Sequence, residues 1–454
     1  MNDRYQITTK VIASADPKMN NQTVRNLWHG FTLTNSSISI ENGQPNTFIL
    51  GNCTAPHLPE GKEYALTVNK DGIAITSKDY GGLMRGYISL LMDVGYAHPA
   101  ESEQLSIPAH HEESDYKLKN RMIHLCVFPE TDFLLLNRAI RLCAVTQYTH
   151  VVIEFWGMLQ YDAMKELSWP QAFSKQKIRA LIQEIRELGM EPIPMVNQVG
   201  HASMCRLISG KHTVLDQNPK LQYLFTPDGW AWNIYSPQAK ALLKKMREEL
   251  YDLFGPGEYI HIGGDEADYY AVNDEFKHDF AAYLGDLTND VVSEGRKPMV
   301  WMDMMVEANK YKDCYGSATA EEAQERRSKL AKESVLIDWQ YDATEAPIES
   351  LQAMSEYSQT VIGAPWLANE AGYKAHIETL VANKMYGIMM TTWHLLNMKS
   401  IEHITGCARA LNAKVLPFGT PPANINLYET ASLLRRISFE GCTYETAGWQ
   451  KNQI

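Results

Sequence analysis

The sequence predicts an α/β protein whose main body is a (β/α)8 TIM barrel, preceded by a small α+β domain. After about residue 114, short apolar runs alternate with amphipathic helical segments, and eight such runs fall within about 300 residues. This repeat is typical of a (β/α)8 barrel. A doubly wound open sheet is the structural alternative. It fits less well, because no Gly-x-Gly-x-x-Gly turn follows a first strand.

Residues 1–114 are expected to form the small non-catalytic α+β domain. Segments 64–68 and 72–76 alternate apolar and polar residues around Asn69-Lys70-Asp71-Gly72, as the strands of a hairpin do. Apolar residues at helical spacing predict an amphipathic helix over roughly 80–94. The polar run 110–115 is expected to be a solvated boundary.

The barrel is expected over residues 115–415. Its predicted strands lie near 121–127, 150–156, 191–197, 258–262, 298–303, 335–340, 360–364 and 386–393. Ser174 is the expected cap of a helix that Gly189 closes. Ser236 caps another helix, with Pro237 at its first position and Gly255 after its end. The tail, 416–454, is expected to be partly helical and is given no role.

The composition favours a globular protein and argues against a nucleic-acid-binding or membrane-binding one. Apolar residues make up 45% and charged residues 21% of the 454 residues, which is ordinary for a globular chain. The formal net charge of −12 argues against a nucleic-acid or anionic-membrane partner and suits a neutral ligand. The seven cysteines show no close pairing, so reduced thiols are expected rather than a disulfide framework.

The N-terminus has no apolar signal region, and no apolar run is long enough to span a bilayer. A cytoplasmic protein is therefore expected, although a secreted protein whose signal had been removed would look the same. The oligomeric state is left open.

The most informative motif is His261-Ile262-Gly263-Gly264-Asp265-Glu266. It follows a short apolar run, and its two glycines allow the backbone to turn sharply at the strand end. Because neighbouring strand residues point to opposite sides, Asp265 and Glu266 are expected to face different parts of one site. That arrangement suits one proton donor and one charge stabiliser.

Other polar and aromatic residues fall at predicted strand ends, where a barrel places its active site. They are Arg121, Glu154, Trp156, Asn197, His201, Trp301, Asp303, Trp339, Tyr341, Trp393 and His394. Sugar rings have apolar faces that pack on indoles and hydroxyls that need polar partners. Carboxylates surrounded by tryptophans therefore indicate a sugar pocket.

These residues resemble glycoside hydrolase family 20, the β-N-acetylhexosaminidases. The motif 261–266 is similar to that family's His-x-Gly-Gly-Asp-Glu signature, and 194–202 resembles its segment ending Gly-His-Ala. Arg121 matches an arginine that holds sugar hydroxyls. Trp301, Trp339 and Trp393 resemble the walls around the acetamido group. Segment 72–94 is similar to the end of the family's N-terminal domain.

The resemblance implies hydrolysis of terminal β-linked N-acetylglucosamine or N-acetylgalactosamine with retention of configuration. The substrate's own acetamido oxygen is the nucleophile, an exception to the scheme of two protein carboxylates. Glu266 is implied as general acid and then base. Asp265 is implied to stabilise the oxazolinium-like intermediate. The substrate is a small molecule or oligosaccharide, and no metal or cofactor is needed.

The chain departs from the family pattern on three strands. The family's strand-2 pattern, His-x-His-x-x-Asp-Asp, is replaced by 150–158, which contains Glu154 and no Asp. In the family one of these Asp residues orients the Gly-His-Ala histidine, which in turn supports the acid. One hypothesis is that Glu154 takes the place of that Asp beside His201. The alternatives are that it pairs with Arg121 or binds sugar directly. Strand 1 has Cys126 where the family has an Asp.

After strand 7 the family's Tyr is missing. Asn369 and Glu370 are candidates for binding hydroxyls, and Tyr341 could instead reach the acetamido oxygen. Two other functions stay open: a non-catalytic carbohydrate-binding protein on the same fold, or a glycosidase for a sugar without an acetamido group.

Overall fold

We describe the fold from a computed structural model. It describes residues 3–32, 36–96, 105–203, 212, 214–271, 273, 275–311, 316–393, 396–414 and 424–439. His394, one of the residues expected at a strand end, lies outside these ranges. No helix within the described residues is both long and apolar enough to cross a bilayer.

The predicted TIM barrel is confirmed. Eight parallel strands close in the order β10-β11-β12-β13-β14-β15-β16-β9. They are β9 (Asn120–Val127), β10 (His150–Phe155), β11 (Glu191–Met195), β12 (Tyr259–His261), β13 (Lys297–Trp301), β14 (Val335–Asp338), β15 (Thr360–Gly363) and β16 (Gly387–Thr392). All eight predicted apolar runs are strands, so the repeating pattern of the sequence is sufficient to predict the barrel.

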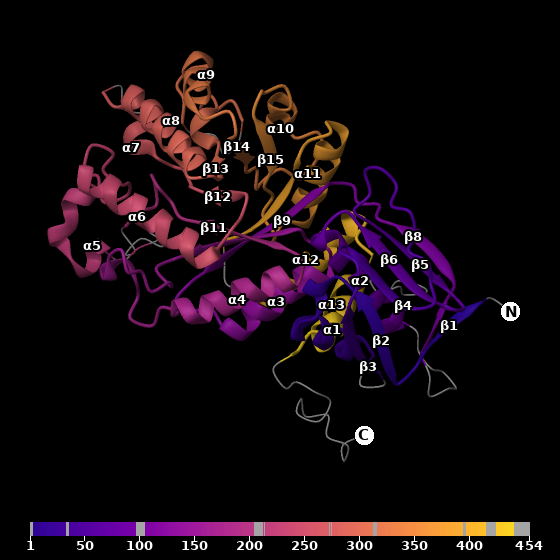
Figure 1. Cartoon of the computed structure of the whole chain (residues 1–454). Coiled ribbons are helices and arrows are strands. Elements are labelled where there is room, and N and C mark those ends of the chain that lie inside the picture. The colour runs from indigo at the N-terminus through magenta and orange to yellow at the C-terminus, as the bar shows by residue number, and fades with distance from the viewer. Residues whose placement is uncertain are drawn as a thin grey trace.

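Helices cover the outside of the barrel (Figure 1). They are α3 (Phe133–Val145), α4 (Lys175–Glu187), α6 (Pro237–Phe254), α8 (Lys277–Ser293), α9 (Ala320–Lys329), α10 (Glu349–Met354), α11 (Glu370–Ala382) and α12 (Met398–Ala410). Two short helices, α5 (Val214–Gln217) and α7 (Asp268–Ala271), lie in the connections after β11 and β12. The expected caps are present. Ser174 accepts a hydrogen bond from the backbone N–H of Lys177, and Ser236 accepts one from Ala239. Gly255 ends α6 with φ 71°.

Apolar side chains fill the barrel interior. This core comprises Met122, Val152, Ile193, Met195, Tyr259, Met299, Trp301, Val335, Ile337, Ile362, Ala364 and Met389. Side chains alternate along a strand, so the position of Met122 inside the barrel turns Arg121 outward and His124 inward. This alternation decides which polar residues can reach a site at the barrel mouth.

The N-terminal region contains the expected α+β fold. Its six-stranded sheet has the order β3-β2-β4-β6-β5-β8, and β1 pairs with β7. The elements are β1 (Arg4–Ile7), β2 (Lys10–Ala15), α1 (Gln22–Thr32), β3 (Ser37–Asn42), β4 (Thr47–Gly51), β5 (Tyr64–Asn69), β6 (Gly72–Ser77), α2 (Tyr80–Tyr96), β7 (Leu105–Pro108) and β8 (His110–Glu113). The predicted hairpin is confirmed. The run at 110–113 is an edge strand paired with β5, so its interpretation as a solvated boundary was wrong.

The tail contains one described helix, α13 (Ile425–Arg436), which packs against α12, α3 and α1. Figure 1 shows this yellow helix beside α1 and α2 of the N-terminal region. The buried Arg436 guanidinium donates to the carbonyl oxygens of Phe31 and Gly95, each at 3.1 Å. A Cβ at Gly30 would lie 1.8 Å from the carbonyl oxygen of Arg436, so glycine permits this contact. The tail therefore joins the N-terminal region to the barrel.

Candidate active site

The Asp265-Glu266 pair lies at the C-terminal end of the barrel. Strand β12 ends at His261, and the backbone then turns through Gly263 with φ 72° and Gly264 with φ 100°. Glycine adopts such angles more readily than residues that carry a side chain. A Cβ on Gly263 would also lie 2.6 Å from Cγ of Asn197. The two glycines therefore bring the carboxylates over the strand end, as the sequence predicted.

Both carboxylates meet one imidazole. Nε2 of His201 lies 3.1 Å from Oδ2 of Asp265 and 3.3 Å from Oε2 of Glu266. The expectation that the carboxylates face different parts of the site was based on strand alternation. It was wrong in this respect, because the segment after His261 is no longer a strand and Glu266 has φ 44°. Their environments still differ: the Asp265 side chain is 10% exposed and that of Glu266 is 37% exposed.

Further hydrogen bonds fix the pair from three sides. The Asn197 amide donates to Oδ1 of Asp265 at 3.2 Å, and Nε1 of Trp230 donates to the carbonyl oxygen of Glu266 at 2.7 Å. The backbone N–H of Glu266 donates to Oδ2 of Asp303 at 2.9 Å. The Asp265 carboxylate and the backbone of Glu266 are thus held by residues from three different parts of the barrel mouth, which favours a preorganised site.

Asp303 is buried beside these acids. Burial and the charge of Asp265 raise the pKa of Asp303 well above its usual value, although hydrogen bonds from Glu266 and Trp339 oppose the shift. Burial and the charge of Glu266 also raise the pKa of Asp268 on α7. The site therefore concentrates carboxyl groups that compete for protons, a common property of active sites.

Three of the expected aromatic residues line the partly exposed face of this site. The rings of Trp339 and Tyr341 are 5.0 Å apart, and Nε1 of Trp393 donates to the Tyr341 hydroxyl at 2.6 Å. Trp339 also donates to Oδ1 of Asp303 at 3.3 Å. Burial chiefly raises the pKa of Tyr341 well above 10, with a contribution from the charge of Asp265. Its phenol therefore stays protonated at neutral pH.

Trp301 differs from the other predicted wall residues. Its side chain is fully buried inside the barrel, with its ring 4.5 Å from that of His261 and 5.8 Å from that of Trp393. It lies inward on β13 because side chains alternate along the strand. Trp301 is therefore part of the core in this structure, which corrects its assignment to the wall around the acetamido group.

The predicted role of Arg121 in binding sugar is also wrong. Arg121 lies at the start of β9, 1% exposed, and donates to the carbonyl oxygens of Leu118 and Gln147, each at 2.8 Å. It also pairs with Glu63 at 3.0 Å. These partners lie at the opposite end of the barrel from the carboxylate pair. Arg121 therefore links the barrel to the N-terminal region.

Glu154 has different partners from those considered in the sequence. Its Oε2 lies 3.2 Å from Nε2 of His124 and 3.6 Å from Sγ of Cys126, and it accepts from Nε1 of Trp156 at 3.2 Å. Among the described residues, no hydrogen bond joins Glu154 to Arg121. The pairing with Arg121 is therefore not observed, because Arg121 has its partners at the other end of the barrel. Support of His201 by Glu154 stays a prediction.

Asn369 and Glu370 do not serve as the expected hydroxyl ligands. The Asn369 side chain caps α11 by accepting from the backbone N–H of Gly372, and it donates to the carbonyl oxygen of Tyr341 at 2.9 Å. Glu370 is exposed and pairs with Lys374 one helical turn later. Asn369 thus positions the backbone of Tyr341, and Glu370 belongs to the solvated helix surface.

Sequence reasoning gave no role to several residues of the site. Trp230 comes from the loop before α6 and lies with its ring 4.5 Å from His201. Asn197 and Asp303 were noted only for their place at strand ends. Alternation along β9 was the available signal for His124, because it places residues 122, 124 and 126 on one side.

A buried carboxylate beside a more exposed one, bordered by indoles at the mouth of a (β/α)8 barrel, defines a glycoside-hydrolase type of site. Residues 148–367 match the model of glycosyl hydrolase family 20, catalytic domain. Residues 148–367 therefore form a divergent catalytic domain of glycosyl hydrolase family 20.

Solved structures share the fold at low sequence identity. An exo β-N-acetylglucosaminidase from Vibrio harveyi in complex with N-acetylglucosamine is 14% identical with a TM-score of 0.65, covering 98% of this chain and 76% of that one. A chitobiase from Flavobacterium johnsoniae is 15% identical with a TM-score of 0.68, covering 97% and 71%. A β-N-acetylhexosaminidase from Streptomyces coelicolor is 16% identical with a TM-score of 0.65, covering 98% and 93%. No curated protein sequence matches the chain significantly.

Proposed function

We propose that this protein is an exo-acting, retaining β-N-acetylhexosaminidase that removes terminal β-linked N-acetylglucosamine or N-acetylgalactosamine. The observation that carries the proposal is the Asp265-Glu266 pair, whose carboxylates share the His201 imidazole yet differ in exposure. The proposal is supported by the family-20 catalytic domain and by the exo β-N-acetylglucosaminidase activity of the Vibrio harveyi neighbour.

In the first step the acetamido oxygen of the substrate attacks the anomeric carbon, and the bond to the leaving oxygen breaks. Glu266 gives its proton to that oxygen. Asp265 accepts a hydrogen bond from the acetamido N–H and stabilises the positive charge of the cyclised intermediate. In the second step water attacks the anomeric carbon and Glu266 takes its proton. The bond from the acetamido oxygen to that carbon breaks, so the acetamido group is restored on the sugar and configuration is retained.

The exposures of the two acids fit these roles. The more exposed Glu266 is accessible to a leaving group and then to water, whereas the buried Asp265 needs only to meet the acetamide. Tyr341 carries a protonated phenol beside Asp265 and is the proposed donor to the acetamido oxygen. Holding nucleophile and electrophile within one bound sugar contributes several kcal/mol to catalysis, on the order of 7–11 in favourable cases.

His201, Asn197 and Asp303 are proposed as positioning residues, because each contacts Asp265 or Glu266 rather than the sugar. Trp339 and Trp393 are the proposed walls for the sugar, since both are partly exposed and joined through Tyr341.

The test is a panel of aryl β-glycosides: N-acetylglucosaminide, N-acetylgalactosaminide, glucoside and galactoside, with 6-sulfated forms. The proposal predicts release of phenol from the N-acetylated sugars and a fall in kcat of at least ~100-fold for Glu266→Gln. Glu370→Gln is the matched control, because this glutamate is exposed on the surface of α11 and forms an ion pair with Lys374.

Two outcomes would replace the proposal. Binding of N-acetylated sugars without turnover would identify a carbohydrate-binding protein. Faster turnover of the plain glucoside or galactoside would identify a glycosidase for a sugar without an acetamide, and would leave Asp265 without a role.

A further inference from the structure

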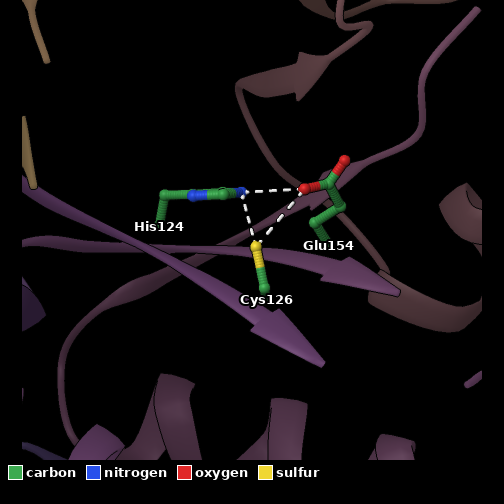
Figure 2. A group of neighbouring side chains, drawn as sticks. All are labelled: His124, Cys126 and Glu154. Carbon is green, nitrogen blue, oxygen red and sulfur yellow. Dashed lines mark hydrogen bonds and ion pairs between the residues drawn. The ribbon is translucent and has the colours of Figure 1, made fainter. Parts of the chain in front are cut away.

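A second group of reactive side chains lies inside the barrel, on β9 and β10. Nε2 of His124 lies 3.2 Å from Oε2 of Glu154, Sγ of Cys126 lies 3.8 Å from the same nitrogen, and Sγ lies 3.6 Å from the same oxygen. Figure 2 shows the three side chains pointing toward one another. Their three donor atoms form a closed triangle.

Strand geometry explains why they meet. His124 and Cys126 are two residues apart on β9, so both face the barrel interior. Glu154 is directly opposite Cys126 in the parallel pairing of β10 with β9. All three are buried: His124 is 0%, Cys126 3% and Glu154 1% exposed. These are rigid strand positions and not loop residues, so the triangle is held by the fold.

The arrangement does not fit a nucleophilic triad. In such a triad the imidazole uses one nitrogen for the nucleophile and the other for the carboxylate. Here the thiol and the carboxylate both lie at Nε2 of His124. Its Nδ1 is buried without a hydrogen-bond partner among the described residues. Three donors that converge on one point fit a shared cation.

The distances agree with zinc. With zinc–nitrogen and zinc–oxygen bonds near 2.0–2.1 Å and a zinc–sulfur bond near 2.3 Å, tetrahedral angles separate the ligand atoms by roughly 3.3–3.6 Å. The observed separations are 3.2 Å from nitrogen to oxygen, 3.8 Å from nitrogen to sulfur and 3.6 Å from oxygen to sulfur. Thiolate and imidazole ligands favour zinc over magnesium or calcium, which prefer oxygen.

We propose that His124, Cys126 and Glu154 bind one zinc ion through Nε2, Sγ and a carboxylate oxygen. Three protein ligands leave the fourth tetrahedral position for another ligand. Two of the three residues, Cys126 and Glu154, stand in the strand-1 and strand-2 segments where the chain departs from the family-20 pattern. The site is therefore a property of this chain and does not depend on the proposed glycosidase activity.

The site lies directly beneath the proposed sugar pocket. The His124 ring is 4.6 Å from that of Trp393, and Trp393 donates to Tyr341. Zinc on His124 thus fixes the ring on which a wall of the pocket rests.

A second possible ligand group, Asp93, His110 and Glu112, provides the control. The ammonium group of Lys414 already contacts Asp93 at 2.8 Å and Glu112 at 2.6 Å. That cation neutralises the carboxylates, so this group is not expected to bind zinc.

The experiment measures metal in the full-length protein. The chain is stripped with a chelator, given zinc, passed over a desalting column and analysed by elemental mass spectrometry. About one tightly bound zinc per chain is expected for the wild type and for His110→Asn. Cys126→Ser and Glu154→Gln should lose it. Cobalt(II) in place of zinc should give a thiolate charge-transfer band in the wild type that disappears in Cys126→Ser.

Circular dichroism checks that each variant folds. If a variant unfolds, anomalous scattering at the zinc edge in wild-type crystals tests the site instead. A peak is expected between the three side chains. No bound zinc in the wild type, zinc retained in both Cys126→Ser and Glu154→Gln, or an anomalous peak elsewhere would overturn the proposal.

Discussion

Nε2 of His201 lies 3.3 Å from Oε2 of Glu266, the proposed general acid. Residue 201 has φ 55°, a backbone conformation in which Asn is well tolerated. We therefore expect His201→Asn to fold and to lower kcat by roughly 10- to 100-fold, with KM little changed, because Glu266 loses a polar partner. The pH dependence of kcat should shift as well.

Kinetics of an aryl N-acetylhexosaminide from pH 4 to 9 would measure both effects. A merely structural role for His201 would lower the amount of active protein and leave the shape of the profile unchanged.

Asp303 provides a prediction about stability and pH. Burial and the charge of Asp265 raise its pKa well above the unfolded value, so the folded protein binds a proton more tightly than the unfolded chain. The stability contributed by this group is present at low pH and is lost as pH rises from about 4 through the raised pKa. Asp303→Asn does not titrate and should weaken this dependence.

Denaturant unfolding of the wild type and Asp303→Asn at several pH values between 4 and 8 measures the difference. A constant loss of about 1–3 kcal/mol is also expected for the variant, because one amide oxygen cannot accept from both Glu266 and Trp339. Parallel curves for the two proteins would contradict the assigned pKa shift.

The Arg121–Glu63 pair should contribute to stability and not to substrate binding. Burial raises the pKa of Glu63, but the charges of Arg85 and Arg121 outweigh it and hold the value below the usual range. Arg121→Gln should lower the free energy of unfolding by about 2–3 kcal/mol. The loss is not larger because Glu63 keeps Arg85 as a partner. KM should not change. A large rise in KM with unchanged stability would restore Arg121 as a sugar ligand.

The buried His376 on α11 should make the stability of the fold sensitive to acid. Burial lowers the pKa of His376 to about 4, below its ordinary 6.5. Between these values the unfolded chain binds a proton that the folded protein does not, so stability falls as pH decreases from 6.5 to about 4. From pH 7 to pH 5 this one group should reduce stability by about 2 kcal/mol.

Burial lowers the pKa of His150 as well, so the acid sensitivity of the wild type alone does not isolate His376. The measurement therefore compares the wild type with a His376 variant. Denaturant unfolding of His376→Gln should show a loss between pH 7 and pH 5 that is smaller than the wild-type loss by about that amount. An equal loss in both proteins would show that His376 is protonated with an ordinary pKa.

The sequence was sufficient for features that depend on neighbouring residues. The eight strands, the caps at Ser174 and Ser236, and the turn at Gly263-Gly264 all follow from local pattern. The approach of His201 to Glu266 was expected only through family resemblance.

Features that depend on side-chain direction and distant contacts were harder to predict. Arg121 and Trp301 both lie on predicted strands. Arg121 faces outward at the base of the barrel, whereas Trp301 is buried in the barrel interior. Trp230 reaches Glu266 from 36 positions away, and no local pattern indicates that contact. The meeting of Cys126 with Glu154 requires the pairing of β9 with β10.

The central claim is that the bound sugar's amide acts as the nucleophile beside Asp265. The most direct measurement is kcat/KM for aryl β-glucosaminides whose N-acetyl group carries none, one, two or three fluorine atoms. Fluorine withdraws electrons from the amide oxygen, so the account predicts a steep fall in kcat/KM with each substitution. A rate independent of fluorination would contradict it, because the oxygen would then take no part in breaking the glycosidic bond.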